Sequence, residues 1–276
     1  MVTRMAPESH ARPGGGPPDG WEARLFGTRF SSVEHVEATG STNADLLARA
    51  CEAADGIVRV TDHQTAGRGR LGRRWDAPPG ANLLVSVLVR PHWPSENHPL
   101  VTPALAVAAV DALAGIGVPS AVKWPNDLVI EGGPVPGKVA GILAEYTVGP
   151  PAAVVVGLGL NLAWPAAQDD APPGATSLRA CGHTVDRWDL LAVLLAGFDD
   201  RLGDLAGAGG PERLREAHLG RSATVGRRVR ADTPTGPVEG TAVDIRVDGS
   251  LLVRPDGSTD APVLVAAGDV THLTPA

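Results

Sequence analysis

The sequence contains few cysteine, methionine and aromatic residues. It has two cysteines, two methionines and one tyrosine in 276 residues, and only 4% of its residues are aromatic. Cys51 and Cys181 lie far apart and lack the paired spacing of metal ligands. A chain of this length does not need disulfides to fold, so we interpret both cysteines as reduced, buried thiols in a cytoplasmic protein.

The sequence also lacks a membrane-spanning run, a secretory signal and an excess of positive charge. Its most apolar stretch, residues 100–115, contains Pro103 and Asp111 and is too short to cross a bilayer. The net charge is −7, which argues against a protein that coats nucleic acid. Because no membrane-spanning run is found, we expect no membrane partner. No Ser-His-Asp or Cys-His pattern is evident, so we expect no covalent enzyme intermediate.

The chain divides into three parts by composition and pattern. Residues 1–20 are rich in Pro and Gly and predict a disordered tail. Residues 21–218 alternate strand and helix patterns, with tight Gly, Pro and Asn turns, which predicts an α+β domain: a mixed, mainly antiparallel sheet flanked by helices. Residues 219–276 hold short β runs separated by turn residues, which predicts a small β-barrel.

Three segments of the α+β domain give more specific predictions. GSTNADLLARACEAADG, residues 40–56, predicts a helix in which Thr42 and Asp45 form a capping box. DRWDLLAVLLAGFDDRLGDL predicts a helix capped at Asp186. The strand VVVGLGLN is expected to break at its glycines and Asn161, either as a bulge or to bring backbone close to a base or ribose.

GRGRLGRRW, residues 67–75, contains the dinucleotide-binding pattern G-x-G-x-x-G. That pattern must open a helix, whereas Pro78, Pro79 and a strand follow here, which disfavours a Rossmann site; a Walker G-K-[ST] ending is also absent. A solvated basic loop would explain the arginines but neither the glycines nor Trp75. Glycines permit positive φ and close backbone approach, and arginines bind carboxylate or phosphate. We interpret the segment as a flexible, anion-binding flap.

Two further motifs each allow two interpretations. KWPND, residues 123–127, is either an ordinary turn or a nucleotide-binding edge, with Lys123 toward phosphate and Asn126 and Asp127 toward magnesium or a proton donor. Lys138 in GKVAGILAE either reaches solvent or neutralises a reacting phosphate.

In combination, GRGRLGRRW, KWPNDL, GKVAGILAE and GLGLN are more specific than any one of them. With GSTN and Gln64, they make the chain similar to the bacterial biotin protein ligases from about Ser41 to the C-terminus. The resemblance implies a catalytic domain at 21–218 and an SH3-like barrel at 219–276. It also implies the activity: biotin reacts with MgATP to give biotinyl-5′-AMP, and the biotinyl group passes to a lysine of a biotin carboxyl carrier domain of an acyl-CoA carboxylase. No redox cofactor is expected.

The resemblance also implies roles for individual residues. Biotin contacts are expected from Ser41, Thr42, Asn43, Gln64, Arg68, Gly69, Arg70 and Lys138. ATP or adenylate contacts are expected from Arg70, Trp75, Lys123, Asn126, Asp127 and Asn161. Catalysis is expected to depend on Lys138, Arg68 and Asp127, with magnesium near Asp127 and Asp127 as the general base.

The same motifs allow two alternative functions. A lipoate ligase or octanoyltransferase shares this catalytic fold, although the residues of the KWPND motif and of the arginine-rich segment favour a biotin ligase. A non-catalytic binding protein that uses the barrel belongs to a different class, and the retained cations argue against it. Some family members carry an N-terminal winged helix that binds operator DNA. Few residues precede Ser41, so we expect a ligase without repressor activity and without a DNA partner.

Overall fold

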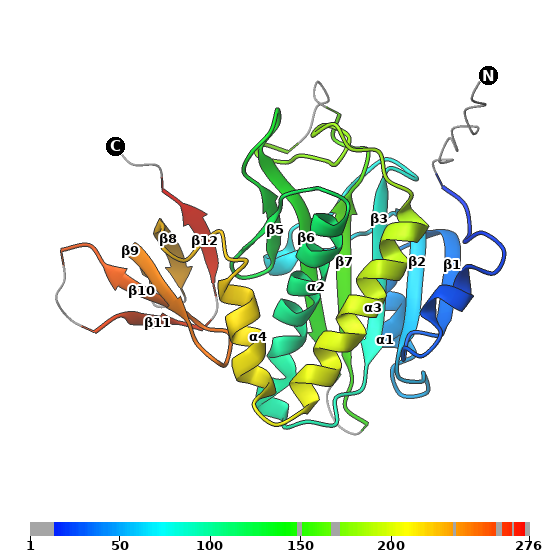
Figure 1. Ribbon diagram of the computed structural model, residues 1–276, viewed down its shortest axis with the longest axis horizontal. Helices are drawn as coiled ribbons and strands as arrows, with labels where there is room; N and C mark the ends of the chain where they lie inside the picture. The colour runs from blue at the N-terminus through cyan, green and yellow to red at the C-terminus, as the bar shows by residue number, and fades with distance from the viewer. Residues whose placement is uncertain are drawn as a thin grey trace, which may run out of the picture.

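A seven-stranded sheet forms the larger part of the fold, in the order β1-β2-β3-β7-β6-β5-β4 (Figure 1). The computed structural model of the protein describes residues 14–147, 151–166, 172–233, 236–257, 261–266 and 268–273. The strands are β1 (Ser32–Thr39), β2 (Ile57–Gln64), β3 (Asn82–Val89), β4 (Ala121–Lys123), β5 (Asp127–Ile130), β6 (Gly137–Tyr146) and β7 (Val154–Asn161). Within this sheet, β1 and β2 pair in parallel and the other neighbours pair antiparallel. The predicted mixed, mainly antiparallel sheet is confirmed.

Helices cover both faces of this sheet (Figure 1). The helical elements are η1 (Trp21–Leu25), α1 (Thr42–Ala48), η2 (Arg70–Gly72), η3 (Ser95–Leu100), α2 (Val101–Gly115), α3 (Arg187–Ala206) and α4 (Gly210–Leu219). Side chains alternate between the faces of a strand. In β3, Val87 and Val89 therefore join the core beneath α2 and α3, whereas Leu88 packs with Leu46 of α1 on the other face. The sheet is thus buried on both sides next to α1.

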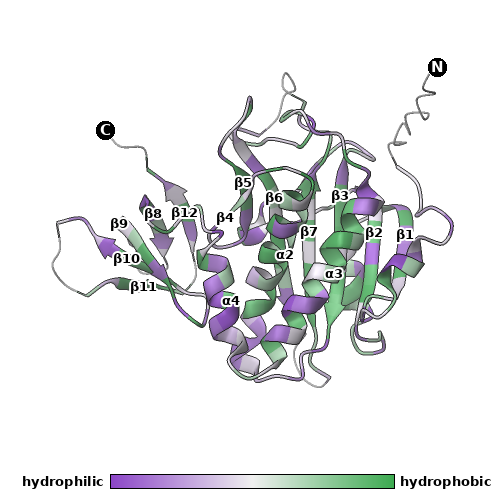
Figure 2. Cartoon of the chain, viewed as in Figure 1, coloured by the Kyte–Doolittle hydropathy of each residue, from purple (hydrophilic) through white to green (hydrophobic). Residues whose placement is uncertain are grey.

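The apolar helix α2 is a core element. With η3 it spans Ser95–Gly115, a segment long and apolar enough by composition to cross a membrane. Eleven residues of α2 are buried, however, because the helix packs on the sheet and on α3. In Figure 2, α2 consists mostly of hydrophobic residues, whereas hydrophobic and hydrophilic residues alternate along α3. Asp186 caps α3 by accepting from the N–H groups of Trp188 and Asp189, as predicted.

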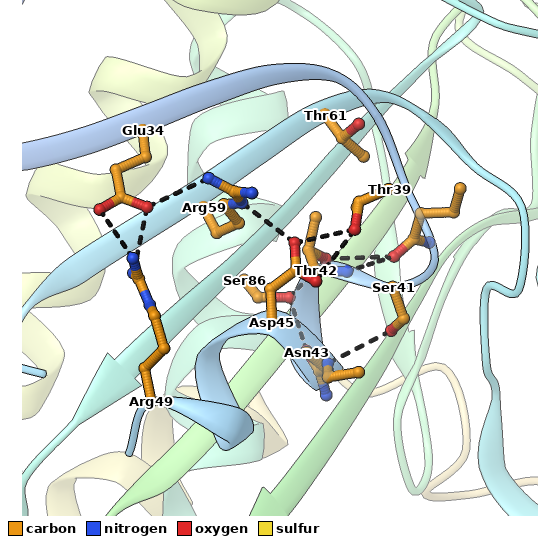
Figure 3. A network of polar contacts seen from close by, with 12 residues as sticks. Glu34, Thr39, Ser41, Thr42, Asn43, Asp45, Arg49, Arg59, Thr61 and Ser86 are labelled. Carbon is orange, nitrogen blue, oxygen red and sulfur yellow. Dashed lines mark hydrogen bonds and ion pairs between the residues drawn. The ribbon is translucent and has the colours of Figure 1, made fainter. Parts of the chain in front are cut away.

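Helix α1 differs from its prediction. It ends at Ala48, so a helix over residues 40–56 is wrong, and its N-cap is Ser41, whose hydroxyl accepts from the Ala44 N–H. The predicted capping box of Thr42 and Asp45 is also wrong. The Asp45 carboxylate accepts from the Thr39 hydroxyl at 2.9 Å and pairs with Arg59 at 3.1 Å (Figure 3). The Asp45 side chain therefore contacts residues of β1 and β2, and it does not take part in the N-terminal cap of α1.

The prediction that both cysteines are buried is wrong for Cys51 and holds only in part for Cys181. Both cysteines are free, but Cys51 is exposed and Cys181 is half-buried. Cys51 lies after the end of α1, in a turn that the helical pattern did not anticipate.

A second sheet follows α4 and contains five antiparallel strands in the order β11-β10-β9-β8-β12. The strands are β8 (Arg228–Thr233), β9 (Gly236–Ile245), β10 (Leu251–Pro255), β11 (Val263–Val265) and β12 (Asp269–His272). The predicted division between residues 218 and 219 lies at the end of α4, before β8 begins. Trp124 from the KWPND motif belongs to the apolar core of this second sheet, and its indole N–H donates to the carbonyl oxygen of Gly249 at 2.9 Å.

The predicted tail is described only from residue 14; residues 1–13 lie outside the described residues. The Gly15 N–H donates to the Asp62 carboxylate at 2.9 Å, and Arg187 pairs with the same carboxylate at 2.6 Å. Burial works to raise the pKa of Asp62, but these contacts and His35 outweigh burial and lower it. The described end of the predicted tail is therefore held against β2 and α3.

Candidate functional site

One pocket lies on the α1 face of the sheet, between α1, strands β3, β7 and β6, and the segment of residues 67–75, called here the arginine loop. Helix α1 has only seven residues and leaves the rest of this face uncovered. The pocket contains most of the polar residues that the sequence motifs single out. Its walls are contributed by Ser41, Thr42, Asn43, Gln64, Arg68, Gly69, Arg70, Arg73, Arg74, Trp75, Asp76, Ser86, Asn126, Lys138, Gly141, Gly157, Gly159, Asn161, Trp164 and residues 172–175, together with apolar side chains of β3, β6 and β7.

Uncharged hydrogen-bonding groups line the end of the pocket beside α1. The N–H of Thr42 donates to the Gln64 amide oxygen at 2.9 Å, and the Thr42 and Ser86 hydroxyls lie 2.6 Å apart. Ser86 in turn donates to the Asn43 amide oxygen at 2.6 Å (Figure 3). Short hydrogen bonds among buried groups fix the orientation of each member. This end of the pocket therefore presents a preorganised set of neutral donors and acceptors.

Glycines in β6 and β7 form the floor of the pocket. A Cβ atom on Gly157 would lie 2.3 Å from the amide oxygen of Asn43, and one on Gly159 would lie 2.5 Å from the indole of Trp75. A Cβ on Gly141 would meet the same indole at 3.0 Å. The predicted break of this strand is wrong, because β7 pairs without interruption with β3 and β6. Its glycines provide space for Asn43 and Trp75 instead of bending the strand.

The arginine loop folds back on itself. The Trp75 N–H donates to the Gly67 carbonyl oxygen at 3.0 Å and the Gly69 N–H donates to the Arg73 carbonyl oxygen at 2.7 Å. The chain reverses at Leu71 and Gly72, whose φ values are 55° and 73°. The expectation of positive φ holds for Gly72 but not for Gly69, whose φ is −110°. Residue 67 must be glycine for another reason, since its Cβ would lie 2.3 Å from the Trp75 carbonyl oxygen.

Positive charge gathers at the other end of the pocket. Lys138 Nζ lies 2.6 Å from an Asp127 carboxylate oxygen and 5.5 Å from the centre of the Trp75 ring. Arg70 donates to the Asn126 amide oxygen at 3.1 Å. Asn126 is held in turn by its own donation to the Ile142 carbonyl oxygen at 2.6 Å. Two cations and an indole therefore face the same space.

The second sheet also contacts the arginine loop. Arg70 donates to the carbonyl oxygen of Gly268 at 3.2 Å, and Arg73 pairs with the Asp269 carboxylate at 2.9 Å. Gly268 lies close to β8, because a Cβ atom there would meet the Asp232 carbonyl oxygen at 2.3 Å. Both domains therefore hold the loop.

The structure brings most predicted site residues together. All of them except Lys123 and Asp127 line the pocket, and Asp127 contacts it through Lys138. Lys123 ends β4 and its charge lies near His272 of the second sheet; burial first, and then Lys123 and Arg227, lower the pKa of His272 to about 4. The assignment of single residues to biotin or ATP stays a prediction. Asn161 is held by Asn82 and by the Thr176 carbonyl oxygen.

Two residues to which the sequence motifs assigned no role lie at the site: Ser86 lines the pocket, and Glu145 lies just outside its wall and contacts Asn43. Ser86 is the one polar residue in LLVSVLV, and it is fully buried. A hydroxyl in an otherwise apolar strand is a usable signal, because a buried hydroxyl needs a partner. Glu145 stands at the end of GKVAGILAE, and its carboxylate accepts from the Asn43 amide at 2.8 Å.

No group of three or more His, Cys, Asp or Glu side chains is placed to hold a metal ion in the part of the chain that the structure describes. Asp127, the carboxylate predicted to lie near magnesium, already pairs with Lys138. The described residues therefore do not form a ready-made metal site.

Comparison with known proteins identifies the two domains. Residues 36–161 match the Biotin/lipoate A/B protein ligase family, and residues 224–273 match the Biotin protein ligase C terminal domain. The chain is 41% identical over 256 residues to a biotin–[acetyl-CoA-carboxylase] ligase of Mycobacterium tuberculosis, which covers 90% of this chain and 91% of that one. It is 35% identical over 238 residues to a ligase of the same name from Paracoccus denitrificans, covering 83% of this chain and 96% of that one.

The fold is also similar to that of a solved structure. A biotin protein ligase from Aquifex aeolicus, in complex with biotin and ATP, aligns with a TM-score of 0.72 over 88% of this chain and 100% of that chain, at 24% identity.

Proposed function

This chain belongs to the biotin protein ligase family and is an ATP-dependent ligase that attaches biotin to protein, and from this premise we propose which of its residues carry each step. The single observation that carries the proposal is the division of the pocket into an uncharged end and a cationic end. Biotin has a neutral ureido ring and a carboxylate, and ATP brings phosphates and an aromatic base. The uncharged end of the pocket matches the ureido ring, and the cationic end matches the biotin carboxylate and the phosphates.

The uncharged end binds the ureido ring. The ring presents N–H donors and a carbonyl acceptor, and the hydroxyls and amides of Ser41, Thr42, Asn43 and Gln64 supply their complements. Such groups confer specificity because an analogue that fails to match them leaves buried polar atoms unpaired. A lipoate ligase is not favoured, because the dithiolane ring of lipoate offers no hydrogen-bonding groups to this end.

The cationic end brings two anions together. A biotin carboxylate oxygen attacks the α-phosphorus of ATP and pyrophosphate leaves, so charges of the same sign must approach. Lys138 and Arg70 offset that repulsion and stabilise the charge of the transition state. Trp75, packed on the glycine floor, offers a flat apolar surface to the adenine together with Asn161. The arginine loop, including Arg68 and Gly69, covers the adenylate and excludes water.

The second step is acyl transfer. The amine of the acceptor lysine attacks the acyl carbon of biotinyl-5′-AMP and AMP leaves with the electron pair of the broken bond. We assign the removal of the amine proton to Asp127, the carboxylate that lies beside Lys138. We propose a biotin carboxyl carrier domain of an acyl-CoA carboxylase as the acceptor, because the relatives are named as ligases that act on acetyl-CoA carboxylase.

Magnesium enters as part of the substrate MgATP and is held mainly by phosphate oxygens. Asp127 is the protein carboxylate that we assign to it. Lys123 contributes to the electrostatic potential around the nucleotide from outside the pocket wall. We place the reaction in the cytoplasm.

One experiment tests the proposal. Purified protein is incubated with ATP and either labelled biotin or labelled lipoate, in the presence of a biotin carrier domain or a lipoyl domain. Label should appear on the carrier domain with biotin alone, and Lys138→Ala should abolish adenylate formation in a folded protein. Labelling of the lipoyl domain, or unchanged turnover by Lys138→Ala, contradicts the assignment.

A further inference from the structure

Glu145 lies just outside the pocket wall and contacts two of the residues that line it, Asn43 and Arg68. It lies on β6, where its carboxylate accepts from the Asn43 amide of α1 at 2.8 Å and pairs with Arg68 of the arginine loop at 3.4 Å. The Glu145 side chain is 25% exposed, so the surrounding water screens these contacts only in part. The carboxylate therefore links the biotin end of the pocket to the loop that covers it.

The contact with Asn43 is the last bond of a hydrogen-bonded series. Ser86 donates its one proton to the Asn43 amide oxygen, and its own oxygen lies 2.6 Å from the Thr42 hydroxyl. The single proton of that hydroxyl has both Ser86 and the Gln64 amide oxygen, at 3.2 Å, within reach. Asn43 then donates from its amide nitrogen to Glu145. The same Thr42 gives its backbone N–H to Gln64. The groups assigned to the ureido ring and the carboxylate of Glu145 are thus one hydrogen-bonded series.

The sheet prevents Asn43 from moving out of this series. Gly157 lies directly across from Ser86 in β3 and from Leu143 in β6. The Asn43 side chain occupies the space above Gly157 and also donates to the Leu143 carbonyl oxygen at 3.1 Å. A group held on three strands cannot rotate freely, so its amide nitrogen stays directed toward Glu145.

We propose that Glu145 is a positioning residue that couples occupancy of the biotin end of the pocket to closure of the arginine loop; this inference rests on the proposed function. Biotin bound to Thr42, Asn43 and Gln64 adds contacts to this series, which stabilises the position of the carboxylate that Arg68 pairs with. Arg68 then acts through Glu145 to hold the loop, while Lys138 and Arg70 neutralise the reacting phosphate.

A double-mutant cycle tests the coupling. Glu145→Gln keeps an acceptor for Asn43 and removes the charge that Arg68 needs, and Arg68→Met removes the partner. We expect each single variant to release biotinyl-5′-AMP roughly tenfold faster than wild type, and the double variant to be no worse than either single one, because both remove the same interaction. Losses that multiply to about a hundredfold overturn the proposal.

Cleavage by trypsin supplies a readout that a merely structural role would not change. The arginine loop contains four arginines, so biotin should protect it from trypsin in wild type and fail to protect it in Glu145→Gln. Arg68→Lys retains the charge and should retain most of the protection, unlike Arg68→Met. Arg68 is about half exposed, so its variants report on the loop even if a Glu145 variant does not fold.

Glu34→Gln is the matched control. Glu34 also links elements, since it pairs with Arg49 at the end of α1 and with Arg59 on β2 (Figure 3), but neither of these partners belongs to the arginine loop. It should behave like wild type in both assays. Protection by biotin that persists in Glu145→Gln overturns the inference while leaving the ligase function intact. A wild-type protein that forms no biotinyl-5′-AMP overturns the proposed function and this inference with it.

Discussion

Adding one methyl group to the floor of the pocket is a direct test of the nucleotide site. In Gly159→Ala, the new Cβ would lie 2.5 Å from Cε2 and 2.6 Å from Nε1 of the Trp75 indole. Contacts this short cannot persist, and the ring is rigid, so Trp75 must move off β7. Overpacking of this kind costs about 1–3 kcal/mol. If the bound state bears that cost, the KM for ATP rises by roughly fivefold to 150-fold.

The assay is pyrophosphate release at varied ATP with saturating biotin, followed by thermal unfolding of each variant. Gly203→Ala is the matched control, because Gly203 lies within α3 and a Cβ atom there meets nothing within 4 Å. That variant should gain about 0.5–1 kcal/mol in stability and keep its turnover. An unchanged KM for ATP in a folded Gly159→Ala protein would show that Trp75 does not take part in nucleotide binding.

Three further predictions concern separate parts of the molecule. Burial lowers the pKa of His218 from 6.5 to about 4. As pH falls, His218 therefore takes up a proton in the unfolded chain before it does so in the folded protein. Its contribution to the free energy of unfolding is complete above pH 6.5 and falls by about 3 kcal/mol on approach to pH 4. His218→Leu should remove that part of the acid sensitivity in denaturant titrations at several pH values, and an unchanged pH profile argues against the assignment. Trp124→Ala should destabilise the second sheet by about 3–5 kcal/mol, measured by chemical unfolding. Arg70→Ala should slow adenylate formation and release biotinyl-5′-AMP into solution, detected by filtration; continued retention would contradict a role in the loop.

Periodic patterns allowed most of the fold to be predicted. Alternation and β-branched runs predicted the strands, and the 3.6-residue spacing of leucines predicted α3 with its cap at Asp186. In α3 the leucines lie on one buried face, so local sequence and tertiary structure agree there. The site residues, in contrast, are predicted by several motifs together, because each motif alone allows more than one interpretation. Neither the strand pairing nor the spatial meeting of those motifs is visible in any one segment.

The errors arise where tertiary contacts override a local pattern. Asp45 has the spacing of a capping residue, but Thr39 and Arg59 reach it from neighbouring strands. The glycines of β7 suggested a break, whereas they make room for Asn43 and Trp75, which arrive from distant parts of the chain. A glycine required by a neighbour looks the same in sequence as one required by its own backbone.

The KWPND motif shows why sequence order and spatial role diverge. Trp124 is buried in the core of the second sheet, while Asn126, two residues later, holds Arg70 at the pocket. Arg70 also contacts Gly268 of the second sheet, so the two domains meet on both sides of the same cation. A change that loosens the second sheet must therefore disturb the pocket without touching a substrate. Loss of activity in a variant of the second sheet is consequently no evidence that this sheet binds a reactant, unless the position of the arginine loop is measured as well.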